Sequence, residues 1–171
     1  MPEQRVSFNE EQLERMEACL ENLLTKSKGV AVLFASAEGQ PFGQVGSLSD
    51  KDRMALSTLA AGSFAATVAM AKLLGQAGAF QQLFFEGQEH SVYSSAVGEG
   101  SLLTIAFGSS AKPGLVRLLA REATNELLEI VREAREQGME QSVEDLIHAE
   151  FGESLADELD ALFPEGGEGI E

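Results

Sequence analysis

The feature that most constrains the fold is the stretch 54–71, which reads MALSTLAAGSFAATVAMA and contains no charged residue. Its composition predicts a helix that is apolar on every side, and such a helix must be covered on more than one side. One side can pack on a sheet of the same chain. The many Ala and Gly residues would let a neighbouring backbone approach another side closely, which indicates a partner.

The charge balance argues against two classes of partner. The chain has 171 residues, a formal net charge of -16 and a sequence pI near 4.4. Nucleic acids and anionic membranes both attract clustered Lys and Arg. We therefore expect neither a nucleic acid nor a membrane as a partner. The length fits one domain with a tail.

Cysteine content and targeting patterns point to the cytoplasm. A lone cysteine, Cys19, cannot form an intrachain disulfide, and its place on an apolar helix stripe predicts a buried, inert thiol. The N-terminus lacks a basic-then-apolar signal pattern. The small and polar residues within 54–71 favour a buried helix over a membrane span. We expect a cytoplasmic protein.

Hydrophobic spacing predicts an α+β domain with the order α-β-β-α-β-β-β-α. The expected helices cover 10–27, 50–75 and 115–137, and the expected strands cover 30–36, 41–45, 80–86, 90–97 and 101–107. They should form a five-stranded, mostly antiparallel sheet with helices on both faces. The first and third helices each carry a single apolar stripe and can share one face. The second helix is then alone on the other face.

We expect a domain over 1–138, followed by an acidic C-terminal tail over 139–171. No Lys or Arg follows Arg135. Two capping-box spacings predict two short helices separated by Gly152, with Pro164 closing the second. The second has one apolar face, formed by Leu155, Leu159, Leu162 and Phe163. Two interpretations stay open: this helix docks on its own domain or frays, or it becomes ordered in a partner's groove.

The sequence offers no catalytic constellation. His90 and His148 with one cysteine do not make a zinc site of recognisable spacing. No serine nucleophile elbow is present, and the glycine patterns fit neither a dinucleotide fingerprint nor a P-loop. We expect no metal, no cofactor and no enzymatic activity of the chain's own.

At about 100° per residue, the second helix has two different sides. The side with larger residues is expected to lie on the sheet and comprises Leu56, Leu59, Ser63, Ala66, Met70, Leu73 and Leu74. The other side is small and uncharged until its last residue, and it is expected to bind a partner through Thr58, Ala61, Gly62, Ala65, Val68, Ala69 and Lys72.

The strand after this helix is a candidate sheet edge, and an unpaired apolar edge invites pairing with a second copy. A two-fold dimer would set two such helices side by side and merge two sheets. The expected dimer contacts are Phe64, Phe80, Gln82 and Phe84.

Over about residues 10–135 the chain resembles the roadblock family of dynein light-chain-related domains. The resemblance rests on 29–36 with Glu38-Gly39, on the helix LAAGSFAATVAMAKLLG, on the strands through Val92-Tyr93, and on Pro113-Gly114-Leu115-Val116-Arg117. Within the family it is most similar to bacterial members that regulate a small Ras-like GTPase.

This resemblance implies a homodimer that binds a Ras-like GTPase and stimulates GTP hydrolysis without an arginine finger, by repositioning the GTPase's own catalytic residues. It implies a role in cell polarity or motility and a C-terminal segment that affects nucleotide exchange. Ala65 and Ala69 match small residues of the family's docking platform. The alternatives are a scaffold that binds without altering turnover, and a sensor that holds a small ligand over the sheet.

Overall fold

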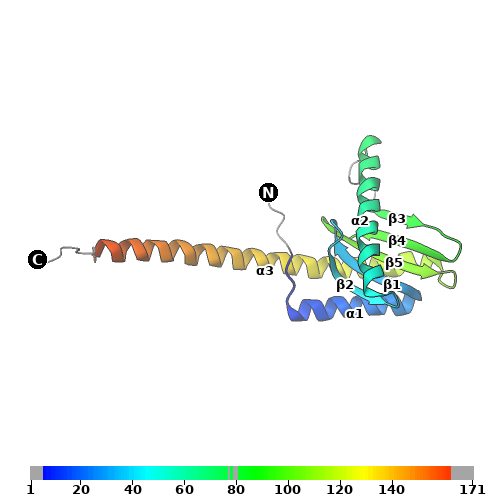
Figure 1. Cartoon of the computed structure of the whole chain (residues 1–171), viewed down its shortest axis with the longest axis horizontal. Helices are drawn as coiled ribbons and strands as arrows, with labels where there is room; N and C mark the ends of the chain where they lie inside the picture. Colours follow the sequence, from blue (N-terminus) through cyan, green and yellow to red (C-terminus); the bar gives the residue numbers. More distant parts are fainter. Residues whose placement is uncertain (1–5, 77, 79–80, 163–171) are drawn as a thin grey trace, which may run out of the picture. The chain divides into compact units, whose positions relative to one another are not determined.

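The computed structural model describes the backbone of residues 6–76, 78 and 81–162, with side chains described as far as residue 149. The element order matches the expected one (Figure 1). The elements are α1 (Glu10–Ser27), β1 (Gly29–Ser36), β2 (Pro41–Gly46), α2 (Asp50–Leu73), β3 (Gln82–Phe85), β4 (His90–Ala96), β5 (Ser101–Gly108) and α3 (Pro113–Leu162).

The chain divides into two units. One is Phe8–Arg132, which we call the domain, and the other combines Met1–Ser7 with Glu133–Glu171. We call the helical part of the second unit, from Glu133 to Leu162, the extension.

The domain is built on a five-stranded sheet in the order β2-β1-β5-β4-β3. All four neighbouring pairs are antiparallel, so the predicted fold class is confirmed. The central strand β5 is buried along nearly its whole length, as its run of apolar residues predicted. The strands β2 and β3 form the two edges.

One face of the sheet carries the main hydrophobic core, between the strands and helices α1 and α3. Met16 and Leu20 of α1, Leu127 and Ile130 of α3, and Phe34 of β1 are fully or almost fully buried there. Spacings of three and four residues align the helix side chains into one stripe each.

A capping box at Asn9 fixes the start of α1. The Asn9 side chain accepts a hydrogen bond from the Gln12 backbone N–H at 2.8 Å, and the Gln12 side chain accepts one from the Asn9 backbone N–H at 3.0 Å.

Helix α2 contacts the strands β1, β2 and β5 from the other side. Its start is fixed by Ser49, whose hydroxyl accepts a hydrogen bond from the Asp52 backbone N–H at 3.1 Å. Figure 1 shows α2 running across the direction of the strands, with α1 and the first part of α3 running along them. The domain therefore has two helices on one face and one on the other, as predicted.

Helix α3 does not end at residue 137. It runs without a break from Pro113 to Leu162, so the prediction of two short helices separated by Gly152 is wrong. A single Gly costs a helix interior only about 1 kcal/mol, and the surrounding Glu, Ala, Leu and Met are strong helix formers. The hydroxyl of Ser142 donates to the Gly138 carbonyl at 2.8 Å and thus bonds back into the helix.

Candidate partner-binding surface

The side of α2 that lies on the sheet is made of small residues. Ser57, Ala60, Ala61, Thr67 and Ala71 are buried there. The hydroxyl of Ser57 donates to the Gly39 carbonyl oxygen at 3.2 Å and ties the helix to the β1–β2 turn. Gly39 has φ +88, and a Cβ atom on it would lie 2.9 Å from the Thr58 Cα. The small residues and this glycine let α2 pack closely on the turn.

Four of the five large residues that were predicted to lie on the sheet are exposed and the fifth, Leu56, is half-buried, which corrects the predicted assignment of sides. Leu59, Met70 and Leu73 are 67%, 54% and 87% exposed, and Leu74 is 69% exposed. Both sides of α2 are apolar, so the helical spacing alone could not show which one is buried. Close packing against Gly39 requires small side chains and excludes the bulky ones. We call Leu59, Ala66, Met70 and Leu73 the outward side.

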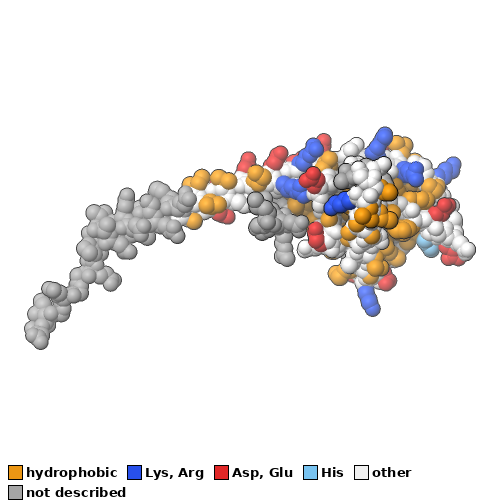
Figure 2. Space-filling view, turned by 90° about the horizontal axis from the view of Figure 1, so that it is seen from above, with side chains coloured by type: hydrophobic (Ala, Val, Ile, Leu, Met, Phe, Trp, Pro, Cys, Tyr) orange, Lys and Arg blue, Asp and Glu red, His pale blue; other side chains and the backbone are white. Residues whose placement is uncertain are grey.

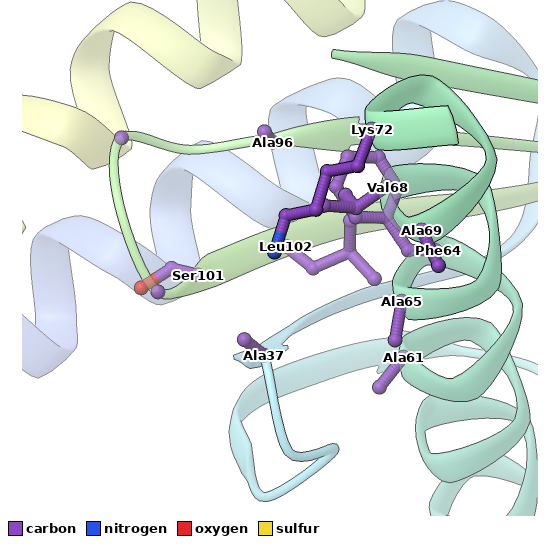
Figure 3. A pocket seen from close by; sticks show the side chains of 12 residues that line it. Ala37, Ala61, Phe64, Ala65, Val68, Ala69, Lys72, Ala96, Ser101 and Leu102 are labelled. Atoms are coloured by element: carbon purple, nitrogen blue, oxygen red, sulfur yellow. The ribbon is translucent and has the colours of Figure 1, made fainter. Parts of the chain in front are cut away.

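A groove of about 420 Å³ lies beside α2 and opposite the turn between β4 and β5 (Figure 3). On α2 it is lined by Phe64 and Val68, which are half-buried, and by Ala65 and Ala69, which are exposed. Its other wall includes Ala96 and Leu102 of the sheet, together with the turn glycines Gly98 and Gly100. We call the α2 wall, formed by Ala61, Phe64, Ala65, Val68, Ala69 and Lys72, the groove side.

The groove side contains most of the α2 residues that the sequence selected for partner binding. Ala61, Ala65, Val68, Ala69 and Lys72 all line it. Ala61 is the exception in accessibility, because it is only 4% exposed and its contacts lie within the domain.

The two remaining candidates on α2, Thr58 and Gly62, are exposed but lie outside the groove lining. The Thr58 hydroxyl donates to the Met54 carbonyl at 3.2 Å, so it already has a partner within the helix. The structure thus brings together five of the seven helix residues and separates two from them.

The only positive charge on the groove side belongs to Lys72, whose side chain extends across the groove towards β5 in Figure 3. At the other end of α2 the Arg53 side chain is paired with Asp50. The middle of α2 is therefore neutral and apolar over both uncovered sides. Figure 2 looks down on α2 from above, and hydrophobic side chains gather in that part of the domain.

Strand β3 is an edge of the sheet, as predicted, since among the described strands it pairs with β4 alone. Gln82 is exposed, whereas the ring of Phe84 is half-buried and stacks on Phe107 at a centroid distance of 6.2 Å. The Arg117 guanidinium lies 5.8 Å from the centroid of the Phe84 ring. The Phe84 side chain thus already packs in the core, and only the edge backbone of this residue can pair with a second copy.

The remaining predicted dimer contacts differ in their placement. Phe64 lines the groove. Phe80 lies outside the described residues. Phe85, which the sequence did not select, is 51% exposed at the end of β3. It alternates with Phe84 along the strand, and this alternation was the signal that could have identified it.

The predicted tail contacts lie in or beyond the last part of α3. The backbone at Leu155, Leu159 and Leu162 is helical, and Phe163 lies outside the described residues. Their side chains are not described, so their part in binding remains a prediction.

Two titratable groups in the core have shifted pKa values. Burial, together with the nearby charge of Glu126, raises the pKa of the Cys19 thiol to about 12. Burial raises the pKa of Tyr93, and the charge of Arg117 opposes this shift. Both groups belong to the α1–α3 side of the sheet and not to the groove. In the described part of the chain, no three His, Cys, Asp or Glu residues form a group that could hold a metal ion.

By length and composition, α2 is also the one described helix that could cross a membrane, with a mean hydropathy of 1.5 over its best window. This differs from the expectation from sequence. However, 28% of that window is buried in the domain, and α2 contacts three strands of its own sheet. These contacts are typical of a helix that belongs to a folded domain and has apolar sides left uncovered.

Comparison with known proteins agrees with this architecture. A family model described as the Roadblock/LC7 domain matches residues 13–107. Myxococcus xanthus MglB is 30% identical, with a TM-score of 0.69, over 75% of this chain and 96% of that chain. The gliding protein MglB from Thermus thermophilus is 30% identical, with a TM-score of 0.70, over 77% of this chain and 98% of that chain.

A structure described as MglB with a tetrameric arrangement is also 30% identical, with a TM-score of 0.71, over 77% of this chain and 98% of that chain. A Roadblock/LC7 domain from Streptomyces avermitilis, 18% identical with a TM-score of 0.56 over 72% and 97%, shows similarity of fold alone. A sequence comparison with curated proteins found no significant match.

Proposed function

The chain belongs to the Roadblock/LC7 domain family and is MglB-like, and we propose that it is a homodimeric regulator of a small Ras-like GTPase of the MglA type. In this proposal it acts in the cytoplasm, in cell polarity or motility. It stimulates GTP hydrolysis by repositioning the catalytic residues of the GTPase itself. The observation that carries the proposal is the neutral, apolar surface of α2, which the domain leaves uncovered on two sides.

In the proposed homodimer, the groove side of α2 and the edge strand β3 face the second copy. Ala65 and Ala69 are one helical turn apart, and their small side chains allow a second helix to pack at short distance. The β3 edge has backbone groups available for a further strand. A two-fold axis between two β3 edges would place the two α2 helices side by side.

The outward side of α2 is the proposed docking surface for the GTPase. Leu59, Met70 and Leu73 are more than half exposed, although burying such a side chain is worth about 1.5–3 kcal/mol. In a dimer two outward sides would adjoin and form one continuous platform. The platform is uncharged, so its proposed action depends on shape and apolar contact and not on a catalytic group of this chain.

The C-terminal extension is proposed to modulate nucleotide exchange. The sequence contains no Lys or Arg after Arg135, so the extension is strongly acidic. It would favour a basic surface on the GTPase, and Leu155, Leu159, Leu162 and Phe163 are the proposed apolar contacts. This acidic character and the apolar spacing support the proposal.

The test is single-turnover GTP hydrolysis by an MglA-type GTPase, with and without this protein. We expect hydrolysis to accelerate at least tenfold at saturating protein. Leu59→Asp should abolish the acceleration by placing a charge in the platform. Ala18→Arg changes an exposed residue of α1 on the opposite face and should leave the acceleration unchanged.

Unchanged hydrolysis with retained binding would contradict GTPase activation and select the scaffold that binds without altering turnover. Absence of binding would overturn both roles. A monomer in solution that binds a small molecule in the groove would instead favour the sensor, since a volume of about 420 Å³ is in the range of ligand sites.

A further inference from the structure

Helix α3 has a row of exposed arginines within the domain. Arg117, Arg121 and Arg132 are all exposed. They lie along one line of the helix, in steps of four, four, three and four residues that pass through Asn125 and Leu128. We call this line, which covers about 22 Å of helix, the arginine row. The glutamates of the same segment lie on the neighbouring side of the helix, off this line: Glu122, Glu126 and Glu129. The row is therefore a positive stripe in a chain whose formal net charge is -16.

Contacts within the domain place the arginine row beside β3 and β4. The Arg117 guanidinium lies 5.8 Å from the centroid of the Phe84 ring of β3. The hydroxyls of Thr124, one residue before Asn125, and of Ser95 in β4 are 3.1 Å apart. Helix α3 covers the face of the sheet opposite α2, so the arginine row and the α2 surface are separate.

Two of the arginines in the row have no acidic partner. In the described part of the chain, neither Arg121 nor Arg132 forms an ion pair. Arginine suits the binding of carboxylates at an interface, because its planar guanidinium can donate two parallel hydrogen bonds to one carboxylate. Leu118, beside Arg117 and Arg121, is 47% exposed, and Leu128 is half-buried within the row. The row thus offers charged and apolar side chains together.

The charges around the arginine row favour a narrow acidic partner. An anionic membrane or a nucleic acid presents negative charge over a wide surface, so it would also approach the glutamates beside the row. It would further approach α1, which covers the same face of the sheet (Figure 1) and has five exposed glutamates: Glu10, Glu11, Glu14, Glu17 and Glu21. A helix is only about 10 Å in diameter and can contact the row alone.

We propose that the arginine row binds an acidic amphipathic helix of a partner protein. Carboxylates of that helix pair with Arg117, Arg121 and Arg132, and its apolar side chains cover Leu118 and Leu128. The row lies on the face of the sheet opposite α2, so this partner leaves the α2 surface open. The interaction does not depend on the proposed GTPase.

The experiment is a fluorescence anisotropy titration of the full-length chain into a labelled helical peptide of about 20 residues, which is long enough to cover the row. One side of the peptide carries glutamates and the adjoining side carries leucines. The control peptide has glutamine in place of every glutamate. We expect the acidic peptide to bind at least tenfold more tightly than the control at physiological ionic strength, where repulsion from the acidic extension is screened beyond about 8 Å.

Charge reversal then tests the residues of the row. Arg121→Glu combined with Arg132→Glu should weaken binding of the acidic peptide at least tenfold. Lys26→Glu combined with Lys51→Glu makes the same change of net charge at exposed residues of α1 and α2, and should weaken binding less than twofold. Circular dichroism checks that each variant keeps its helix content. Phosphatidylserine vesicles and a DNA duplex should not bind.

Equal losses in the two double variants would overturn the arginine row as a binding site, and so would equal binding of the acidic and glutamine peptides. Binding of vesicles or DNA that is lost with the reversed arginines would overturn the acidic helix as the partner. A molar mass that rises with the concentration of the chain, and no longer does so with the reversed arginines, would assign the row to a second copy instead. These measurements need no GTPase, so they are separate from the test of the proposed function.

Discussion

At the scale of single residues, one glycine allows the end of β2 to lie close to the start of β1. Gly46 ends β2 with φ +121, a conformation that residues with a side chain rarely adopt. A Cβ atom there would overlap the Val30 carbonyl oxygen and lie 2.6 Å from the Ala31 Cα. Both contacts are with the backbone of β1, which cannot move without disturbing the centre of the sheet.

We therefore expect Gly46→Ala to lower the free energy of unfolding by more than about 2 kcal/mol, from backbone strain and the overlap with β1. Urea unfolding at one fixed protein concentration measures this. The control is Gly114→Ala, because an added Cβ in the first turn of α3 meets no atom within 4 Å. A loss below about 0.5 kcal/mol for Gly46→Ala would contradict the strain argument.

The buried thiol of Cys19 predicts a dependence of stability on alkaline pH. Its pKa is raised from 9.0 to about 12 in the folded chain, so the unfolded chain releases this proton first as the pH rises. The stabilisation is complete below pH 9 and is lost as the pH rises towards 12. At pH 10 the loss should be on the order of 1 kcal/mol.

The measurement compares unfolding free energies at pH 8 and pH 10 for the wild type and Cys19→Ala. The variant has lost this group but keeps Tyr93 and every other titrating side chain, so the difference in slope isolates Cys19. If the unfolding free energy changes equally with pH in the two chains, burial does not raise the pKa of the Cys19 thiol.

At the scale of elements, α2 has two uncovered sides that should separate two functions. Ala69→Arg puts a long charged side chain into the groove where the second copy is expected, and should therefore give a monomer. Leu59→Asp changes the outward side and should leave the dimer intact while weakening GTPase binding at least tenfold. Ala18→Arg controls for the added charge.

Molar mass by light scattering and a GTPase titration measure the two effects. A monomer from Leu59→Asp, or an intact dimer from Ala69→Arg, would contradict this division of α2.

The same helix shows what could be predicted from sequence. Its bounds and its Ser49 cap depend on neighbouring residues and were predicted closely, as was the edge position of β3. The choice of its buried side depends on the distant turn at Gly39, and both sides are apolar. Local spacing therefore found Ala65 and Ala69 but assigned Leu59 to the sheet. The continuity of α3 was missed because Gly138 and Gly152 resemble helix ends in the sequence. Each lies among strong helix-forming residues, and a single Gly does not end such a helix.

At the scale of the whole molecule, the domain and the extension should contribute separately to regulation. The domain has the neutral α2 surface, and the extension has a concentrated negative charge. Apolar docking is insensitive to salt, whereas attraction between exposed charges is screened over about 8 Å at physiological ionic strength. The salt dependence of GTPase binding should therefore come from the extension.

Truncation after Gln141 tests this separation. We expect the shortened chain to keep the domain dimer and the acceleration of GTP hydrolysis. Nucleotide exchange or affinity should change, and most of the salt dependence of affinity should disappear because only acidic charges are removed. The full-length chain, measured at the same salt concentrations, is the control. If the truncated chain matches the full chain in exchange, affinity and salt dependence, the extension has no part in GTPase regulation.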